Sequence, residues 1–230
     1  MCSITSFQSH QIDSDFNRLL SVPIIRNTLT NLSSLLFSNE IEHMKSKSTA
    51  ISDMSFPSIS SAFQQCLSIC EIRHNVHLYL CPKINGINAI SVECNDERCI
   101  FLGIKCISVL PDNELRFVLG HELGHIAQGN LSIHLLGGLL ESVNQSSAIL
   151  GSLLSSVLEN RIKDWCRESE LIADQYGLIC SGDLESSQSV IRKANRVEHR
   201  YSENLLELYD YYPIQRHRLM SLEQHALRIF

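Results

Sequence analysis

The chain has 230 residues, of which 44% are hydrophobic and 19% are charged, and its formal net charge is −6. This length accommodates one sizeable domain or a domain with a helical appendage, and the hydrophobic fraction excludes a wholly disordered protein. The acidic balance argues against a general nucleic-acid binder, which needs a basic face.

Nine cysteines are present, and none of them belongs to a Cys-x-x-Cys pair. An odd number of cysteines in a chain of this size is atypical of a disulfide scaffold and favours a reducing compartment. Cys94 and Cys99 flank a turn, so a single bond across a hairpin stays open as an alternative. The sequence also lacks a signal peptide and a spanning apolar run. We therefore predict a soluble, cytoplasmic protein, although export by a route that needs no signal peptide stays open.

The first elements in chain order are helical. Apolar residues at helical spacing predict a helix over residues 14–45, and a serine-rich stretch over 46–61 predicts a linker or loop. A second helix is expected over about 60–72. We therefore expect an N-terminal helical segment and linker over residues 1–60, followed by one domain over residues 61–230.

The periodicity then changes to that of a small sheet. Short β-rich runs, separated by Gly, Pro, Asn and Asp, predict strands over 76–80, 89–94, 99–103 and 107–110. After Pro111 the sequence predicts only helices, over about 112–129, 132–143, 146–180, 184–209 and 213–228. Asp112 is the expected N-cap of the first of these, and Gly129 its C-terminal stop. This order predicts an α+β fold that is mostly helical, with segregated layers.

The first helix after the sheet carries a metal-binding pattern. His121 and His125 are four residues apart, so they share one helix face and can reach one zinc ion. Glu122 lies between them and can take a proton from a water held by that ion. Gly120 and Gly124 each cost the helix roughly 1 kcal/mol relative to alanine, which points to close packing or to a site. Two surface histidines on a core helix are the structural alternative.

A catalytic zinc ion takes three protein ligands and keeps one position open for water. Glu170 is the best third ligand, and Asp174 lies one turn further along the same helix face. Asp174 can then accept the free ring N–H of a ligating histidine and fix its tautomer. Ala173 fits the close approach of two helices. A solvated acidic helix face is the alternative.

These motifs together support a family resemblance over about residues 78–222. Its parts, in order, are Asn88-Ala89 before an expected edge strand, Leu110 through Ile126 around the zinc helix, Glu170 with Ala173-Asp174, and Pro213 with Arg218-Leu219. The chain resembles the gluzincin zinc peptidases that include HtpX and the CAAX prenyl protease. The resemblance implies a zincin-like domain in which a small sheet has an edge strand beside the zinc-binding helix.

The implied activity is that of a zinc metalloendopeptidase acting on a peptide or protein substrate. One zinc ion per chain would be held by His121, His125 and Glu170, with Glu122 as the general base. The alternative is a non-catalytic or latent peptidase-like module that binds a protein partner through its groove. The chain has none of the membrane spans that many relatives carry. The apolar stripe over 139–158 predicts core packing, with peripheral contact with a membrane surface as the alternative.

Two further roles follow from the resemblance. Arg218 would pair with Asp174 or stabilise the charged intermediate. Tyr212 stands where family members often carry histidine, and it would either donate a hydrogen bond to the oxyanion or be a core aromatic. Strand position and the resemblance also predict that an extended substrate pairs with the strand formed by Ile100, Phe101, Leu102 and Gly103.

Overall fold

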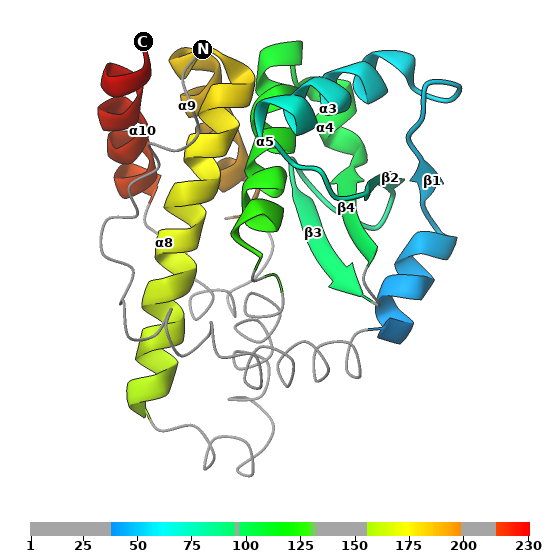
Figure 1. Cartoon of the computed structure of the whole chain (residues 1–230), viewed down its shortest axis with the longest axis horizontal. Coiled ribbons are helices and arrows are strands. Elements are labelled where there is room, and N and C mark those ends of the chain that lie inside the picture. Colours follow the sequence, from blue (N-terminus) through cyan, green and yellow to red (C-terminus); the bar gives the residue numbers. More distant parts are fainter. Residues whose placement is uncertain (1–37, 95–96, 130, 132–155, 199–214) are drawn as a thin grey trace.

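The computed structural model describes residues 38–94, 97–129, 131, 156–198 and 215–230. Helices and one small sheet form segregated layers, as predicted (Figure 1). The sheet and the helix α3 (Pro57–Ile69) lie on one side of the central helix α5 (Asp112–Gln128). The helices α8 (Ser156–Ser181), α9 (Leu184–Glu198) and α10 (Gln215–Ile229) lie on its other side. Within the described ranges, no helix has the length and apolar content needed to cross a membrane.

The sheet has four strands in the order β1-β2-β4-β3. β1 (Thr49–Ala50) and β2 (Val76–Cys81) are antiparallel, β2 and β4 (Glu97–Gly103) are parallel, and β3 (Ala89–Cys94) is antiparallel to β4. β4 is therefore an interior strand, and β3 forms one edge.

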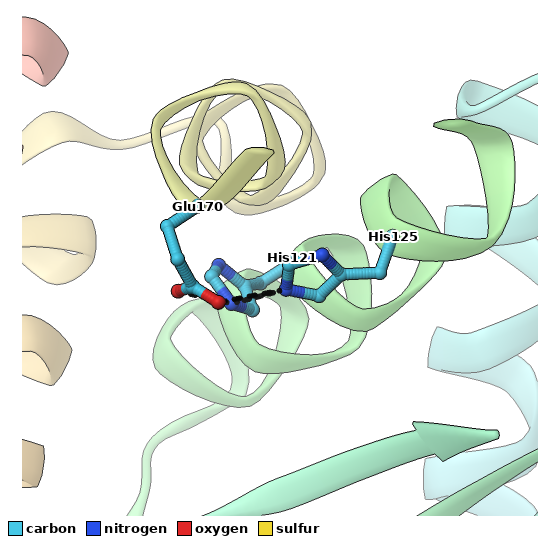
Figure 2. A group of neighbouring side chains, drawn as sticks. All are labelled: His121, His125 and Glu170. Atoms are coloured by element: carbon cyan, nitrogen blue, oxygen red, sulfur yellow. Dashed lines mark hydrogen bonds and ion pairs between the residues drawn. The ribbon is translucent and has the colours of Figure 1, made fainter. Parts of the chain in front are cut away.

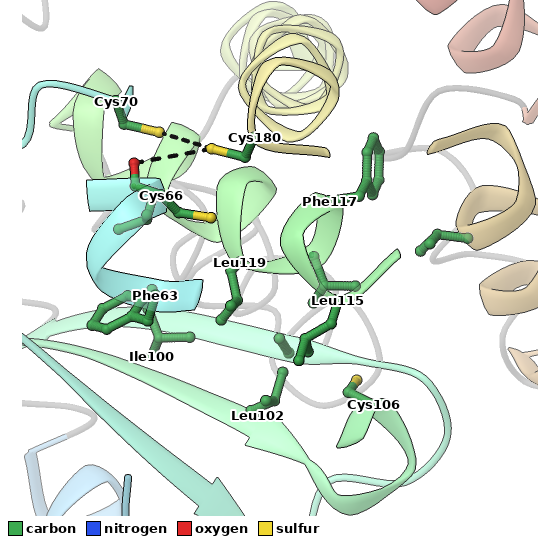
Figure 3. Packing of buried hydrophobic residues seen from close by; sticks show 14 of the residues in the cluster. Phe63, Cys66, Cys70, Ile100, Leu102, Cys106, Leu115, Phe117, Leu119 and Cys180 are labelled. Carbon is green, nitrogen blue, oxygen red and sulfur yellow. Dashed lines mark hydrogen bonds between the residues drawn. The ribbon is translucent and has the colours of Figure 1, made fainter. Parts of the chain in front are cut away.

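Two faces of the sheet are covered by different elements. On one face Ile100 and Leu102 belong to the main core, which also contains Phe63 of α3 and Leu119 of α5 (Figure 3). On the opposite face Phe101 packs in a smaller cluster with residues of the helix over 38–46. This alternation is the period of two that a strand imposes, and it explains why β4 is apolar without interruption from Cys99 to Leu102.

Two local expectations from the sequence are wrong, and the hairpin does not place Cys94 opposite Cys99. Residues 107–110 were expected to form a strand, but Ile104–Val109 form the short helix α4. The expected linker over 46–61 contains β1, which completes the sheet, and the first turn of α3. The hairpin pairs Cys94 with Glu97 and Cys99 with Val92, so the two cysteines are not opposite each other. The helix expected over 132–143 lies outside the described residues, as do parts of the helices expected over 14–45, 146–180, 184–209 and 213–228.

The central helix α5 has the predicted stop and a slightly different start. Pro111 is its N-cap and accepts the Leu115 backbone N–H at 2.9 Å, so Asp112 lies in the first turn and not at the cap. In the first turn the Asp112 carboxylate still interacts favourably with the positive end of the helix dipole. Gly129 follows the last turn with φ of 69°, a left-handed conformation that glycine adopts without strain.

α5 and α8 approach each other more closely than side chains of ordinary size permit. A Cβ atom on Gly120 would lie 2.6 Å from the Cβ of Cys180 and 2.8 Å from the carbonyl oxygen of Tyr176. A Cβ on Gly124 would lie 2.8 Å from the Cα of Ala173. Gly120 and Gly124 therefore allow the two helices to pack backbone against backbone.

Candidate metal centre

His121 and His125 are presented by one face of α5, one helical turn apart. Their Nε2 atoms lie 3.2 Å from each other, and the two rings stand edge to face with centroids 4.8 Å apart. His125 is buried, and the side chain of His121 is 13% exposed. Both rings thus turn the same nitrogen atom toward one point at the edge of the helix.

Glu170 reaches this point from α8. Its two carboxylate oxygens lie 3.4 Å from Nε2 of His121 and 3.3 Å from Nε2 of His125 (Figure 2). The three candidate donor atoms lie within 4.8 Å of one another. The close crossing of α5 and α8 at their small residues permits this approach, because the buried side chain of Glu170 has to extend across the helix interface.

Asp174 lies one turn beyond Glu170 and is fully buried. Its Oδ1 atom is 3.0 Å from Nδ1 of His121, the ring nitrogen that faces away from Glu170. Arg218 of α10 donates to both oxygens of the same carboxylate, at 2.8 Å from Nε and 2.6 Å from Nη2. This two-point contact connects α10 to the site and fixes the Asp174 side chain in one orientation.

His125 has a weaker contact on its outer nitrogen. The hydroxyl of the buried Ser169 lies 3.5 Å from Nδ1 of His125. The Gln128 side-chain amide donates to the carbonyl oxygens of Gly124 and Ser169, at 3.1 and 3.2 Å, and so ties α5 to α8 beside the histidine. Sequence reasoning missed both residues, because a lone serine and a lone glutamine carry no periodic or spacing signal.

The charges of the site alter its titration. Burial lowers the pKa of His121, but the hydrogen bonds and negative charges of Asp174 and Glu170 outweigh it and raise that pKa to about 10. Burial raises the pKa of Glu170, whereas the two histidines hold it well below its ordinary range. For Asp174, burial is likewise outweighed, here mainly by the Arg218 guanidinium, so the pKa is lowered. Without a metal ion, the site therefore binds a proton tightly.

The donor set fits a divalent metal ion. Asp174 is an acceptor, so Nδ1 of His121 carries the proton in the neutral ring and Nε2 carries a lone pair. Three electron-rich groups then point at one position: Nε2 of His121, Nε2 of His125 and the Glu170 carboxylate. Such a cluster is favourable only if a cation occupies that position. Two imidazoles and a glutamate are the three ligands of one class of catalytic zinc site.

Glu122 lies on a neighbouring flank of α5 and is 6% exposed. Among the described residues, no hydrogen bond or ion pair joins its carboxylate to a neighbour. Cys106 of α4 lies near the Glu122 carboxylate, and the Cys106 thiol donates to the carbonyl oxygen of Asn88 at 3.3 Å. Burial raises the pKa of Cys106 to about 12, and the nearby Glu122 carboxylate adds to the rise. Glu122 thus belongs to the side of α5 that faces the start of β3.

The strand that the sequence placed at the edge of the sheet lies in its interior. Residues Ile100 to Gly103 belong to β4, which pairs with β2 on one side and with β3 on the other. Its backbone is therefore not open to an added strand. The edge strand beside the metal-binding helix is β3, which packs against α5. The uninterrupted apolar run of β4 could have indicated an interior strand, since an edge strand alternates with polar residues, as Ser91 and Glu93 do in β3.

The remaining site predictions concern the C-terminal part of the chain. Arg218 pairs with Asp174, the first of the two roles that the sequence left open for it. Tyr212 lies outside the described residues, so its role stays a prediction.

A helix with His-Glu-x-x-His, and a glutamate on a later helix that could complete a metal site with it, are the features of a metallopeptidase of the gluzincin type. The sequence profile of peptidase family M48 matches residues 53–226, and the chain belongs to this family. A comparison with curated proteins found no match. The family assignment agrees with the resemblance to HtpX and the CAAX prenyl protease that the motifs carry.

Proposed function

We propose that this protein is a zinc-dependent endopeptidase with one zinc ion per chain. The convergence of His121, His125 and Glu170 on one position carries the proposal, together with the buried carboxylate of Glu122 on the same helix. A zinc ion bound there supplies a water of lowered pKa and polarises the carbonyl group of the scissile peptide.

Glu122 is the general base in this proposal. Its carboxylate accepts the proton of the attacking water and then passes it to the amine that leaves. Two features of the residue support this role. It lies directly beside the metal ligand His121, and no described neighbour occupies its oxygens.

Asp174 and Arg218 act through His121 and not on the substrate. Asp174 holds Nδ1 of the ring, and Arg218 holds Asp174, so the imidazole keeps the orientation in which Nε2 faces Glu170. This arrangement makes both of them positioning residues. Tyr212 remains a candidate donor to the oxyanion of the tetrahedral intermediate.

The substrate lies extended along the free edge of β3. Within the described part of the chain, one side of β3 pairs with β4 and no strand pairs with the other. β3 packs against α5. The first residue of β3, Ala89, directly follows Asn88, and the Asn88 carbonyl accepts the thiol of Cys106 close to Glu122. Main-chain pairing at this edge orients a peptide without requiring a particular sequence.

The test uses the Glu122→Gln variant, which keeps the size of the side chain and removes its basicity. With a peptide library and added zinc, we expect the wild-type protein to cleave internal bonds, and we expect chelator to stop it. Glu122→Gln should lower kcat/KM by at least about 100-fold while it retains bound zinc. Glu185→Gln, an exposed position on α9, is the matched control. Full activity of Glu122→Gln would overturn the assignment, as would cleavage by the wild type that chelator leaves unchanged.

A further inference from the structure

Three thiols lie together in the core, away from the metal centre. Cys180 is in the last turn of α8, Cys66 is in α3, and Cys70 is the residue that ends α3 (Figure 3). All three are buried and none is in a disulfide. The Sγ atoms of Cys70 and Cys180 are 3.4 Å apart, although the two residues are separated by 110 positions in the sequence.

We propose that Cys70 and Cys180 form a site of oxidative modification, at which a peroxide converts the two thiols into a disulfide bond. A disulfide has an S–S distance of about 2.05 Å, so the sulfur atoms need to approach by a little more than about 1 Å. Cys70 lies at a helix end, where the backbone leaves the helical conformation at Glu71 with φ of 53°. A shift of this size is easier there than within a helix.

The third thiol, that of Cys66, is less well placed for the bond. Its Sγ atom lies 3.9 Å from the carbonyl oxygen of Arg116 on α5. Cys180 contacts the backbone carbonyl of Cys66 at 4.0 Å and also interacts with its thiol, so Cys66 is the competing partner. Cys66 lies in the interior of α3, where a rotation of the backbone would break helical hydrogen bonds. The geometry therefore selects Cys70 as the partner of Cys180.

The chemistry balances with hydrogen peroxide as the oxidant. The sulfur of Cys70 attacks one peroxide oxygen, the O–O bond breaks, and the released hydroxide takes up the thiol proton as water. The sulfenic acid formed on Cys70 is then attacked by the sulfur of Cys180. The S–S bond forms, the S–O bond breaks, and the leaving hydroxide takes the Cys180 proton as a second water. The two sulfurs lose two electrons in total, and the peroxide gains them.

The order of the two steps follows from the environment of Cys180. Hydrogen bonds with Cys66 and Cys70, together with burial, raise the pKa of Cys180, so this thiol stays protonated at neutral pH. We assign the first step to Cys70 because it lies at the end of α3, where the backbone can shift. Because both groups are buried, we expect the oxidation to be slow, and the reduction of the bond by dithiothreitol to be slow as well.

The bond would join the two halves of the domain around the metal-binding helix. It closes a loop that contains the whole of β2, β3, β4 and α5, and it connects α3 to the helix that carries Glu170 and Asp174. Cys180 also packs directly against Gly120, one residue before His121. Closing a loop of this length restricts the unfolded chain strongly, so the oxidised protein should be more stable to heat.

The experiment treats the reduced, full-length protein with hydrogen peroxide and maps its tryptic peptides without reduction. The peptide 48–73 contains both Cys66 and Cys70, and the peptide 168–192 contains Cys180, so the linked pair has a defined mass. We expect this linked species, and a rise in melting temperature of about 5–10 °C that dithiothreitol reverses. In the Cys66→Ala variant the same two peptides should remain linked, which assigns the bond to Cys70. Cys70→Ala should form no link and gain no stability.

Three results would overturn the proposal. The first is a wild-type protein whose Cys70 and Cys180 remain unlinked thiols or go on to sulfinic acid. The second is a link that Cys66→Ala removes, because Cys66 would then be the partner. The third is a link that leaves the melting temperature unchanged. The peptide map of the wild type decides the first point even if a variant folds poorly.

Discussion

Asp174 and His121 are joined by a contact of 3.0 Å between Oδ1 and Nδ1, and the same oxygen accepts a hydrogen bond from Arg218. One fully buried carboxylate thus connects α5, α8 and α10. Because this contact directs Nε2 of His121 toward Glu170, the geometry of the candidate metal centre depends on a residue that is not itself a ligand.

Replacing Asp174 with asparagine should weaken metal binding. The variant keeps the shape of the side chain but removes the charge that holds the His121 N–H, so we expect zinc affinity to fall about 10- to 100-fold. Competition with a chromogenic chelator measures this change directly. Asp164→Asn, at an exposed position on the same helix, should bind zinc like the wild type. Equal affinities in the two variants would show that Asp174 does not support the metal centre.

The metal-free protein should lose stability at alkaline pH. The pKa of His121 is raised from 6.5 to about 10, so its protonated form stabilises the fold. This contribution is complete below about pH 6.5 and disappears as the pH rises through about 10. It amounts to several kcal/mol, on the order of 3–5, by linkage. Denaturant unfolding of the chelator-treated protein between pH 6 and 10.5 measures the slope.

The His121→Gln variant is the control for this slope. It lacks the titrating ring, so its free energy of unfolding should vary little over the same alkaline range. At acid pH the sign reverses, because the lowered pKa values of Glu170 and Asp174 give stability that is present above about pH 4.5 and lost below it. A wild-type protein that is equally stable at pH 6.5 and pH 10 would contradict the protonated state of His121.

Gly120→Ala should destabilise the protein although alanine favours helices. The new methyl group would meet the Cβ of Cys180 at 2.6 Å and the carbonyl of Tyr176 at 2.8 Å, and neither can move without shifting α8. Overpacking of this kind costs about 1–3 kcal/mol, more than the roughly 1 kcal/mol that helix propensity returns. Ala127→Ser, at an exposed site on the same helix, should change the free energy of unfolding by less than about 0.5 kcal/mol. A more stable Gly120→Ala protein would show that α5 and α8 do not pack as described.

The site could be predicted from the sequence because its residues obey short-range rules. His121 and His125 are fixed by helical spacing within one element, and Asp174 by its spacing from Glu170. The α+β class followed from the change of periodicity after about residue 75. What sequence cannot supply is the pairing of elements far apart in the chain. The order of β3 and β4 depends on tertiary packing, and it decided which strand is open to a substrate.

The short elements were the least predictable. Residues 107–110 alternate like a strand, but Gly103 ends β4 and the chain turns immediately into α4. The two residues of β1 have no pattern of their own and are held only by β2. In both places tertiary packing overrides local propensity.

Backbone pairing at β3 predicts how modified substrates behave. A peptide substrate with one N-methylated amide near the scissile bond loses a main-chain donor, and we expect kcat/KM to fall about 10-fold or more when that donor faces β3. Moving the methyl group along the peptide should give alternating weak and strong effects, because successive amides of an extended chain point to opposite sides. Uniform effects at all positions would contradict pairing with a strand.

In the proposed centre two imidazoles and one carboxylate, and none of the nine cysteines, hold the metal ion. X-ray absorption at the zinc edge tests this coordination most directly on the purified, zinc-loaded protein. We predict only nitrogen and oxygen neighbours at about 2.0–2.2 Å, with the outer scattering of two imidazole rings. Sulfur neighbours at about 2.3 Å, or a spectrum that the Glu170→Gln variant leaves unchanged, would contradict it.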